Sequence, residues 1–283
     1  MFVLLLSLTV FGGLVQLIAK KAYSKKIKGG AFIHSALSMF FSLIVFVIIS
    51  GGKLNFVAQL IPYSVLFAIL FSSAFIGSFL ALSVGPISLT GLISSYSLLV
   101  PTIYGILFLN EPTSILLYIG IFLVAVSLFL VNREKKGSEK KISFKWGIFM
   151  LIAFVGNGGG SIVQKVQQLK FNGQYKNEFM VIALLISFVV VFLFALVFEK
   201  ENLLKKITTG AHWYIINGVA NGLVNLFVMM LAVWPASIVF PVISAGGILL
   251  TSSVGIFVYK EKMTAPQIVG IILGTVSIVL LNM

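Results

Sequence analysis

Ten apolar runs alternate with short polar breaks along the chain, and each run is about as long as a membrane span. A helix needs roughly 20 mainly apolar residues to cross the hydrocarbon core of a bilayer. The pattern therefore predicts an all-α membrane protein with ten transmembrane helices. We expect these spans at residues 2–19, 31–50, 60–83, 86–109, 113–131, 146–167, 178–198, 210–233, 235–259 and 264–282.

Part of the chain occurs twice. Residues 105–132 match residues 255–282 at a constant offset of 150, with 10 of 28 positions identical. Five predicted spans fall in each copy, and an odd number would turn the second copy upside down in the membrane. Inverted repeats around a central cavity are typical of secondary transporters. Among the identical pairs are Gly105 and Gly255, Glu111 and Glu261, and Gly120 and Gly270.

A long hydrophilic stretch separates the two copies. We predict a first five-helix repeat over residues 1–131, a basic linker over residues 132–145 and a second five-helix repeat over residues 146–283. Each copy carries a proline near the start of its fourth span, Pro86 or Pro235, ahead of the matched Glu and Gly. Proline fits the first turn of a helix, and the small glycine lets neighbouring helices approach.

These segments resemble the drug/metabolite transporter superfamily, in its EamA-like ten-span branch. The resemblance rests on residues 95–111, continuing to Gly120, and on residues 255–261, continuing to Gly270. It implies a basket of ten helices around a central cavity and the transport of small metabolites by alternating access. The motif is shared across the superfamily and does not specify a substrate.

Composition and charge place the chain in a membrane. It is 59% hydrophobic and only 10% charged, unlike a soluble domain. Sixteen of the twenty Lys and Arg fall in alternate loops on one face, including residues 20–28 and 132–145. Cytoplasmic loops carry such an excess, so we expect the cytoplasmic membrane, basic loops inside and both termini outside. A net charge of +13 could indicate nucleic-acid binding, but its distribution is the one expected of cytoplasmic loops. We therefore expect the lipid bilayer as a partner and no nucleic acid.

The chain lacks the residues that many enzymes and metal sites need. It has no Cys and no Asp, and its seven Glu lie in loops or at predicted helix ends. Its two histidines, His34 and His212, both lie near span ends, so a nucleophile and base within reach of each other are not expected. We predict no catalytic residue, no cofactor and no metal. The small multidrug relatives of the resembled superfamily bind cations through a Glu in a span, which the first span here lacks.

Three asparagines recur every four residues in the predicted span 210–233. Asn217, Asn221 and Asn225 therefore share one helical face. Polar groups in hydrocarbon are costly and usually face the interior of a helix bundle. There the three amides would either join neighbouring helices or bind substrate, and the sequence leaves both interpretations open.

Glycines mark the first helix of each copy. Gly12 and Gly13 lie in the first span, and a triplet beginning at Gly158 follows Asn157 in the sixth. Corresponding glycine-rich interruptions predict loosened backbone beside a binding site, since such backbone is tolerated in a membrane only where it lines a cavity or is buried in protein.

Lys165 is the only cation that we expect inside a span. It either extends to the membrane surface or, together with Gln164, binds an anionic group. The two first helices align either by pairing Lys20 with Lys165 or, three residues out of register, by pairing Gln16 with Gln164.

Small hydroxyl side chains mark the fourth and ninth spans. Ser94 and Ser97 lie in one, Ser244 and Thr251 lie in the other, and Ser94 matches Ser244 at the offset of 150. The resemblance implies that these helices line the cavity. Helix packing through small residues is the alternative.

The second span carries His34, Ser38 and Ser42 at the same helical spacing. A serine in a membrane helix commonly bonds the backbone one turn earlier, which would account for both serines. His34 either reaches the membrane interface or serves as a proton-sensitive group, because histidine titrates near neutral pH.

Together these features predict a secondary transporter for a small neutral, zwitterionic or anionic organic metabolite. The first, second, fourth, sixth, eighth and ninth spans would form its cavity. A passive channel or a membrane-embedded sensor remains the alternative, an intramembrane hydrolase is less favoured, and a homodimer is left open. The predicted substrate-binding residues are Asn217, Asn221, Asn225, Gln164, Lys165, Asn157, Ser94, Ser97, Ser244, Thr251, His34 and Ser38.

Overall fold

The computed structural model describes residues 1–111, 113–131, 143–260 and 264–281, and in these ranges the chain is helical between short connections. In chain order the elements are α1 (Phe2–Lys26), α2 (Ala31–Ile49), the 3₁₀ turn η1 (Ala58–Leu60), α3 (Ile61–Val84), α4 (Ile87–Tyr96), α5 (Leu99–Phe108), α6 (Ile115–Val131), α7 (Phe144–Lys170), α8 (Lys176–Phe198), α9 (Leu203–Leu231), α10 (Ala236–Phe257) and α11 (Ala265–Leu281).

Eight segments of the described chain are long and apolar enough to cross a membrane, with α4 and α5 counted as one segment, Ile87–Phe108. The helices α6 and α11, of 17 residues each, are apolar but shorter. Each predicted apolar run overlaps one of these segments, although α1, α7 and α9 extend several residues beyond the predicted bounds. The protein is therefore all-helical, with the helices of a multi-pass membrane protein.

The predicted span at residues 86–109 is found as one apolar segment, Ile87–Phe108, but it is not one continuous helix, because a turn at Ser97 and Leu98 divides it into α4 and α5. Pro101 has no N–H to donate to the carbonyl of Ser97, four residues earlier. The backbone N–H of Val100 donates to that carbonyl instead, at 3.2 Å, which tightens the chain at the break.

The predicted interruption of the first helix in each copy is also wrong. The helix α1 runs through its glycine pair, and α7 runs through its glycine triplet. Two of these glycines matter through their size. A Cβ on Gly12 would lie 2.5 Å from a methyl group of Val224, and one on Gly158 would lie 2.8 Å from the carbonyl oxygen of Ser97.

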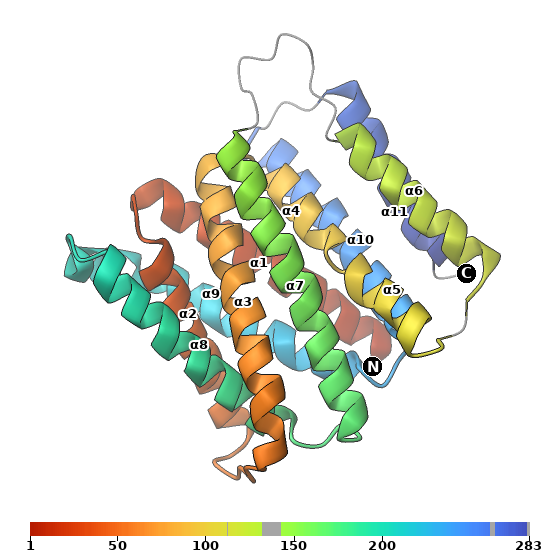
Figure 1. The fold of residues 1–283 in the computed structure, drawn as a ribbon. Coiled ribbons are helices and arrows are strands. Elements are labelled where there is room, and N and C mark those ends of the chain that lie inside the picture. The colour runs from red at the N-terminus through yellow and green to blue at the C-terminus, as the bar shows by residue number, and fades with distance from the viewer. Residues whose placement is uncertain (112, 132–142, 261–263, 282–283) are drawn as a thin grey trace.

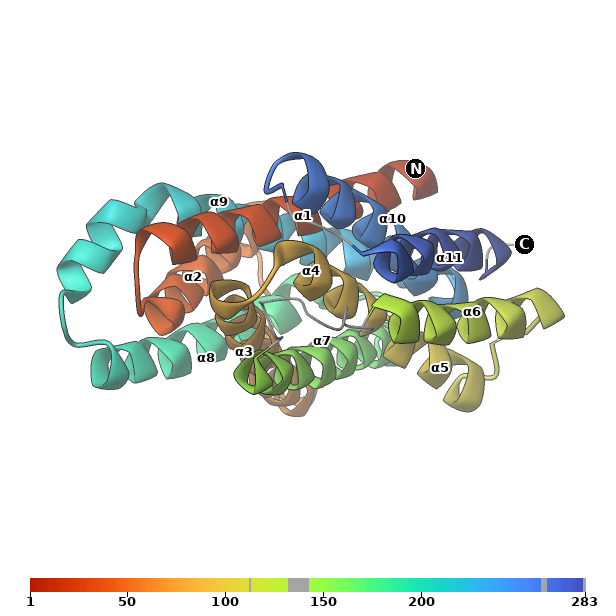
Figure 2. The same cartoon turned by 90° about the horizontal axis from the view of Figure 1, so that it is seen from above.

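The middle of the molecule is formed by α1, α3, α4, α7, α9 and α10, and helix pairs flank it on two sides (Figure 1, Figure 2). The pair α2 and α8 packs together on one side, and α6 and α11 lie side by side on the other. Between them α1 packs on α9, and α3 packs on α7. The middle of the bundle is therefore shared by helices from both halves of the chain.

The contact between α3 and α7 is close enough to require glycine on both helices. A Cβ on Gly77 of α3 would lie 2.8 Å from the carbonyl oxygen of Phe149, and one on Gly156 of α7 would lie 2.5 Å from that of Leu70. Real Cβ atoms do not approach backbone atoms this closely. Small residues therefore set the distance between these helices, as they commonly do in membranes.

A buried carboxylate joins the flanking helices α2 and α8. Glu199, directly after α8, accepts hydrogen bonds from the backbone N–H groups of Phe32 at 2.9 Å and Ile33 at 3.0 Å, in the first turn of α2. Burial raises the pKa of the Glu199 carboxyl above its ordinary value, and the bonds from the backbone oppose that shift. A carboxylate at a helix N-terminus also complements the helix dipole.

The duplicated segments share an unusual local conformation. Asn110 has φ 51° and Lys260, 150 residues later, has φ 52°, both in the left-handed region that non-glycine residues seldom occupy. Pro86 and Pro235 each directly precede a helix, as predicted. The matched Glu261 and most of the predicted linker, residues 132–142, lie outside the described residues.

Candidate functional site

A cavity of about 220 Å³ lies among the six central helices. This volume is below the roughly 300–1,000 Å³ of pockets for drug-sized ligands, so it suits a small metabolite. Its walls come from α1, α3, α4, α7, α9 and α10. The prediction that the second span lines the cavity is therefore wrong, because α2 contributes no lining residue and α3 takes its place.

One face of α1 runs along the cavity from Thr9 past Gln16 to Lys20. These 11 steps of helical rise span about 16 Å. The sequence pattern placed residues 20–28 in a cytoplasmic loop, but α1 continues to Lys26, and Lys20 is only 5% exposed. The prediction that Lys165 is the only cation inside a span is wrong for the same reason.

The side-chain ammonium of Lys20 has few partners. It donates a hydrogen bond to the hydroxyl of Ser78 at 2.8 Å and lies 3.8 Å from the ring centroid of Phe75. Among the described residues no carboxylate pairs with it, since the ion pair found there joins Lys165 and Glu111. The alignment that pairs Lys20 with Lys165 is the sequence signal that could have indicated this cation, but the sequence analysis used it only to compare the first helices of the two copies.

A chain of amide hydrogen bonds crosses the cavity wall. The amide of Asn221 donates to Gln16 at 2.9 Å, that of Asn225 donates to the Asn221 side chain at 3.1 Å, and Gln164 donates to Asn225 at 2.8 Å. All four side chains line the cavity. These amides join α1, α7 and α9 and also face the space where a ligand would lie.

The third asparagine of the row has a different environment. Asn217 lies outside the cavity lining and donates to the hydroxyl of Ser38 in α2 at 3.0 Å. Both side chains are fully buried between α2 and α9. Ser42, also in α2, donates to the carbonyl of Gly218 at 2.7 Å, which adds a second link between the two helices.

His34 does not reach the interface. It is fully buried and packs against the rings of Tyr23 and Phe79, at centroid distances of 4.6 and 5.0 Å. Neither ring nitrogen has a hydrogen-bond partner among the described residues. His34 does not line the cavity either, so the structure places it in an aromatic core behind the cavity wall.

The hydroxyl groups of the fourth and ninth spans divide between the cavity and the helix contacts. Ser94 and Thr251 line the cavity, together with Asn157 of α7. Ser97 accepts a hydrogen bond of 2.5 Å from the Asn157 amide, and Ser244 is buried away from the cavity. Of the twelve predicted residues, the structure brings together at the cavity Asn221, Asn225, Gln164, Asn157, Ser94 and Thr251.

At the positions of the first half that correspond to the asparagine row, α3 carries an aromatic row of phenylalanines. Phe67, Phe71 and Phe75 line the cavity and pack on one another at centroid distances of 5.2 and 5.5 Å. At the offset of 150 they correspond to Asn217, Asn221 and Asn225. Equivalent helices of the two halves therefore provide an apolar wall and an amide wall.

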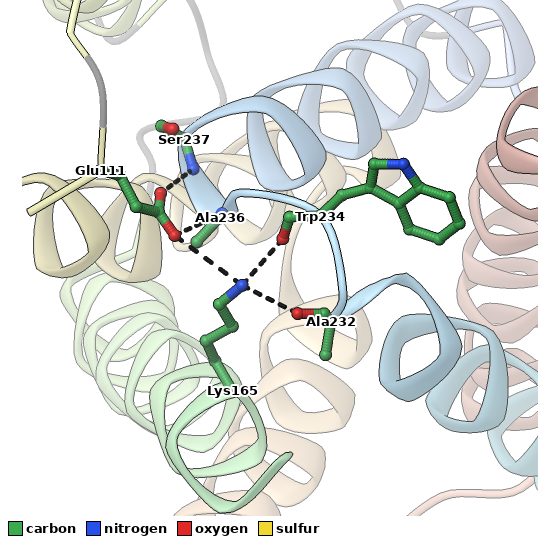
Figure 3. A network of polar contacts seen from close by, with 6 residues as sticks. All are labelled: Glu111, Lys165, Ala232, Trp234, Ala236 and Ser237. Atoms are coloured by element: carbon green, nitrogen blue, oxygen red, sulfur yellow. Dashed lines mark hydrogen bonds and ion pairs between the residues drawn. The ribbon is translucent and has the colours of Figure 1, made fainter. Parts of the chain in front are cut away.

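Lys165 lies outside the cavity lining, in a buried polar network at the connection between α9 and α10 (Figure 3). Its ammonium donates to the carbonyl oxygens of Ala232 at 2.9 Å and Trp234 at 2.8 Å and lies 3.7 Å from the Glu111 carboxylate. Lys165 is only 6% exposed and so does not extend to the membrane surface, contrary to one of its two interpretations.

The carboxylate of Glu111, three residues after the end of α5, completes this network. It accepts hydrogen bonds from the backbone N–H groups of Ala236 and Ser237, both at 2.8 Å, at the start of α10 (Figure 3). A Cβ on Gly105 would lie 2.6 Å from the same carboxylate. The repeated Gly105 to Glu111 spacing thus lets the glutamate fold back and cap a helix of the other half.

Within the residues that the structure describes, no group of His, Asp and Glu side chains is placed to hold a metal ion. The cavity lining consists of apolar, hydroxyl and amide side chains together with Lys20. Such a surface offers hydrogen bonds, apolar packing and one positive charge to a molecule in the cavity.

Comparison with known proteins places the fold but not the activity. No family model matches the sequence, and no curated protein matches it. Solved structures do match, 28 chains in all. One of them, described as "Crystal structure of protein", has a TM-score of 0.67 at 12% sequence identity, over 97% of this chain and 96% of that chain. The likeness runs along almost the whole chain, and the two proteins therefore share this helical fold.

Proposed function

We propose that the protein is a secondary transporter that moves a small organic metabolite across the cytoplasmic membrane by alternating access. The observation that carries this proposal is the polar cavity, which lies in the middle of a bundle of membrane-length helices and is lined from both halves of the chain. Polar groups inside a membrane bundle usually mark a substrate pathway.

Paired contacts support an arrangement of ten spans as two inverted repeats of five. Lys165 of α7 bonds two carbonyls at the end of α9, and Lys21 of α1 bonds the carbonyls of Leu82 at 2.7 Å and Gly85 at 2.6 Å, at the end of α3. Leu82 and Ala232 are 150 residues apart, the offset of the duplication. In the two halves α1 corresponds to α7 and α3 corresponds to α9, so the contact of α1 with α9 and that of α7 with α3 are equivalent.

Inverted repeats suit alternating access because two halves of similar structure rock against each other around a fixed site. The cavity here lies where both halves meet, with the phenylalanines of α3 on one wall and the amides of α9 on another. The excess of Lys and Arg in the connections and adjoining helix ends of one face, counted without the buried Lys20, supports basic loops in the cytoplasm and both termini outside.

The proposal is tested by counterflow in proteoliposomes, after a thermal-shift screen of amino acids, sugars, nucleosides and vitamins has identified a ligand. A carrier accelerates uptake of labelled ligand when unlabelled ligand is present inside. A passive channel shows uptake without this acceleration, and a sensor binds the ligand without flux. Either result would overturn the proposal.

Asn221→Leu is expected to reduce counterflow about tenfold, because it removes an amide that faces the cavity and leaves its buried partners unsatisfied. Such a loss costs about 1–3 kcal/mol, and about 1.4 kcal/mol corresponds to a factor of ten. Asn217→Leu is the matched control, since it removes an asparagine of the same face that bonds Ser38 outside the cavity. Equal losses in both variants, with equal losses of folded protein, would show that the row only joins helices.

A further inference from the structure

Lys20 is a buried cation whose surroundings lack an opposite charge. A charged side chain in the membrane interior is costly unless it is paired or reaches water. Lys165 meets this need with two carbonyls and Glu111, and Lys21 with two carbonyls. Lys20 has one hydroxyl partner and one aromatic ring, so its ammonium retains capacity for a further acceptor.

No side chain that lines the cavity offers Lys20 a negatively charged acceptor. The lining holds no Glu, and the chain has no Asp. The amides of Gln16, Asn221, Asn225 and Gln164 bond one another. The positive charge of Lys20 at one end of the cavity is therefore uncompensated by the protein that surrounds it.

We propose that the cavity binds a small organic anion, whose carboxylate or phosphate group lies on Lys20 and Ser78 and whose apolar body packs along Phe67, Phe71 and Phe75. That the bound anion is also transported rests on the proposed function, whereas anion binding itself does not. The charged end of the ligand is held by a hydrogen bond from the Lys20 ammonium to the anionic group. Hydrogen bonds between ionised groups are stronger than those between neutral groups. The amides on α9 face the remaining polar groups of the ligand.

The aromatic row explains why the body of the ligand is apolar or aromatic. Three phenyl rings succeed one another along α3 and end at Phe75, over which the Lys20 ammonium lies. An anionic group at Lys20 therefore directs the rest of a bound molecule along these rings. Aromatic rings pack on such surfaces in offset or edge-to-face contact.

Binding is measured by titration calorimetry on the full-length protein, purified in a maltoside detergent without phosphate. The probes are phenylacetate, phenyl phosphate and the neutral phenylacetamide, which differ mainly in the charged group. The native protein is expected to bind at least one of the two anions about tenfold or more tightly than the amide. The carboxylate and phosphate arms show which anion the site prefers.

Lys20→Gln is expected to abolish the preference for anions, and Lys20→Arg to retain part of it. Lys170→Gln is the matched control, because Lys170 also bonds a hydroxyl, that of Tyr63 at 2.9 Å, and lies 5.2 Å from its ring, but on the exposed surface. This control is expected to keep the native preference. If Lys20→Gln does not fold, Ser78→Ala keeps the charge and is expected to weaken anion binding severalfold.

The outcomes separate this proposal from the transport proposal. Anion binding that depends on Lys20, without counterflow of the bound anion, would retain the anion site and overturn transport. Counterflow of phenylacetamide as fast as that of phenylacetate would retain transport and overturn the anion site. Absence of binding by both anions, or a preference that survives Lys20→Gln, would also overturn the anion site.

Discussion

Glu111→Ala is expected to destabilise the folded protein by roughly 3–5 kcal/mol, the usual loss when one partner of a buried ion pair is removed. The substitution leaves the Lys165 ammonium buried beside two carbonyls without its carboxylate. It also removes the acceptor for the first two N–H groups of α10. Chemical unfolding in mixed micelles measures the loss of free energy.

A double-mutant cycle separates the ion pair from the helix cap. Lys165→Met alone is expected to be destabilising, because Glu111 then remains buried with only its two backbone donors. The double variant Glu111→Ala/Lys165→Met should be less destabilised than the sum of the single variants. Each single variant leaves one buried charge without its partner, whereas the double variant leaves none. Purely additive losses would show that the two side chains, at 3.7 Å, do not stabilise each other.

Gly156→Leu is expected to abolish the folded protein, and Gly156→Ala to cost about 1–3 kcal/mol, the usual range for adding volume to a close-packed contact. A Cβ there would lie 2.5 Å from the carbonyl oxygen of Leu70 and 2.7 Å from the backbone nitrogen of Ala74. Backbone atoms of a membrane helix cannot move aside as a flexible side chain can. The yield of monodisperse protein and its melting temperature measure the effect.

Gly147→Ala controls for the intrinsic gain in helix stability. Gly147 lies in the same helix, α7, and a Cβ on it would meet nothing within 4 Å. Alanine in place of glycine in a helix gains up to about 1 kcal/mol, so this variant should melt at or above the native temperature. If Gly156→Ala melts like Gly147→Ala, the close contact between α3 and α7 does not limit stability.

The helices were largely predictable because length and apolarity are local properties. Each of the ten predicted runs corresponds to helix in the described residues, and the run at 86–109 is divided between two helices. An apolar stretch in lipid must satisfy its own backbone hydrogen bonds. The break between α4 and α5 was missed although Pro101 is visible in the sequence. Proline within a membrane helix produces a break, a bend or neither, depending on which neighbouring groups replace the lost hydrogen bond.

The candidate site was predicted in part for a similar reason. Helical period placed Asn217 and Asn221 on one face, but that face borders α2 at one residue and the cavity at the other. Helical periodicity shows which residues share a face, but not which of them contact a neighbouring helix and which line a cavity. The row Phe67, Phe71 and Phe75 was overlooked because phenylalanine in an apolar helix does not stand out, whereas asparagine does.

The apolar segments and their helical type, the duplication at an offset of 150, and many of the polar residues that face inward could be read from the sequence alone. These follow from composition and period along one helix. Only the tertiary structure decided which of those residues meet at the cavity. Lys20 and Lys165 are both buried lysines, and the physical difference between them lies in other parts of the chain. The two carbonyls and the carboxylate that bond Lys165 belong to the connection between α9 and α10 and to the residues after α5. Lys20 instead faces a cavity whose other walls carry no opposite charge.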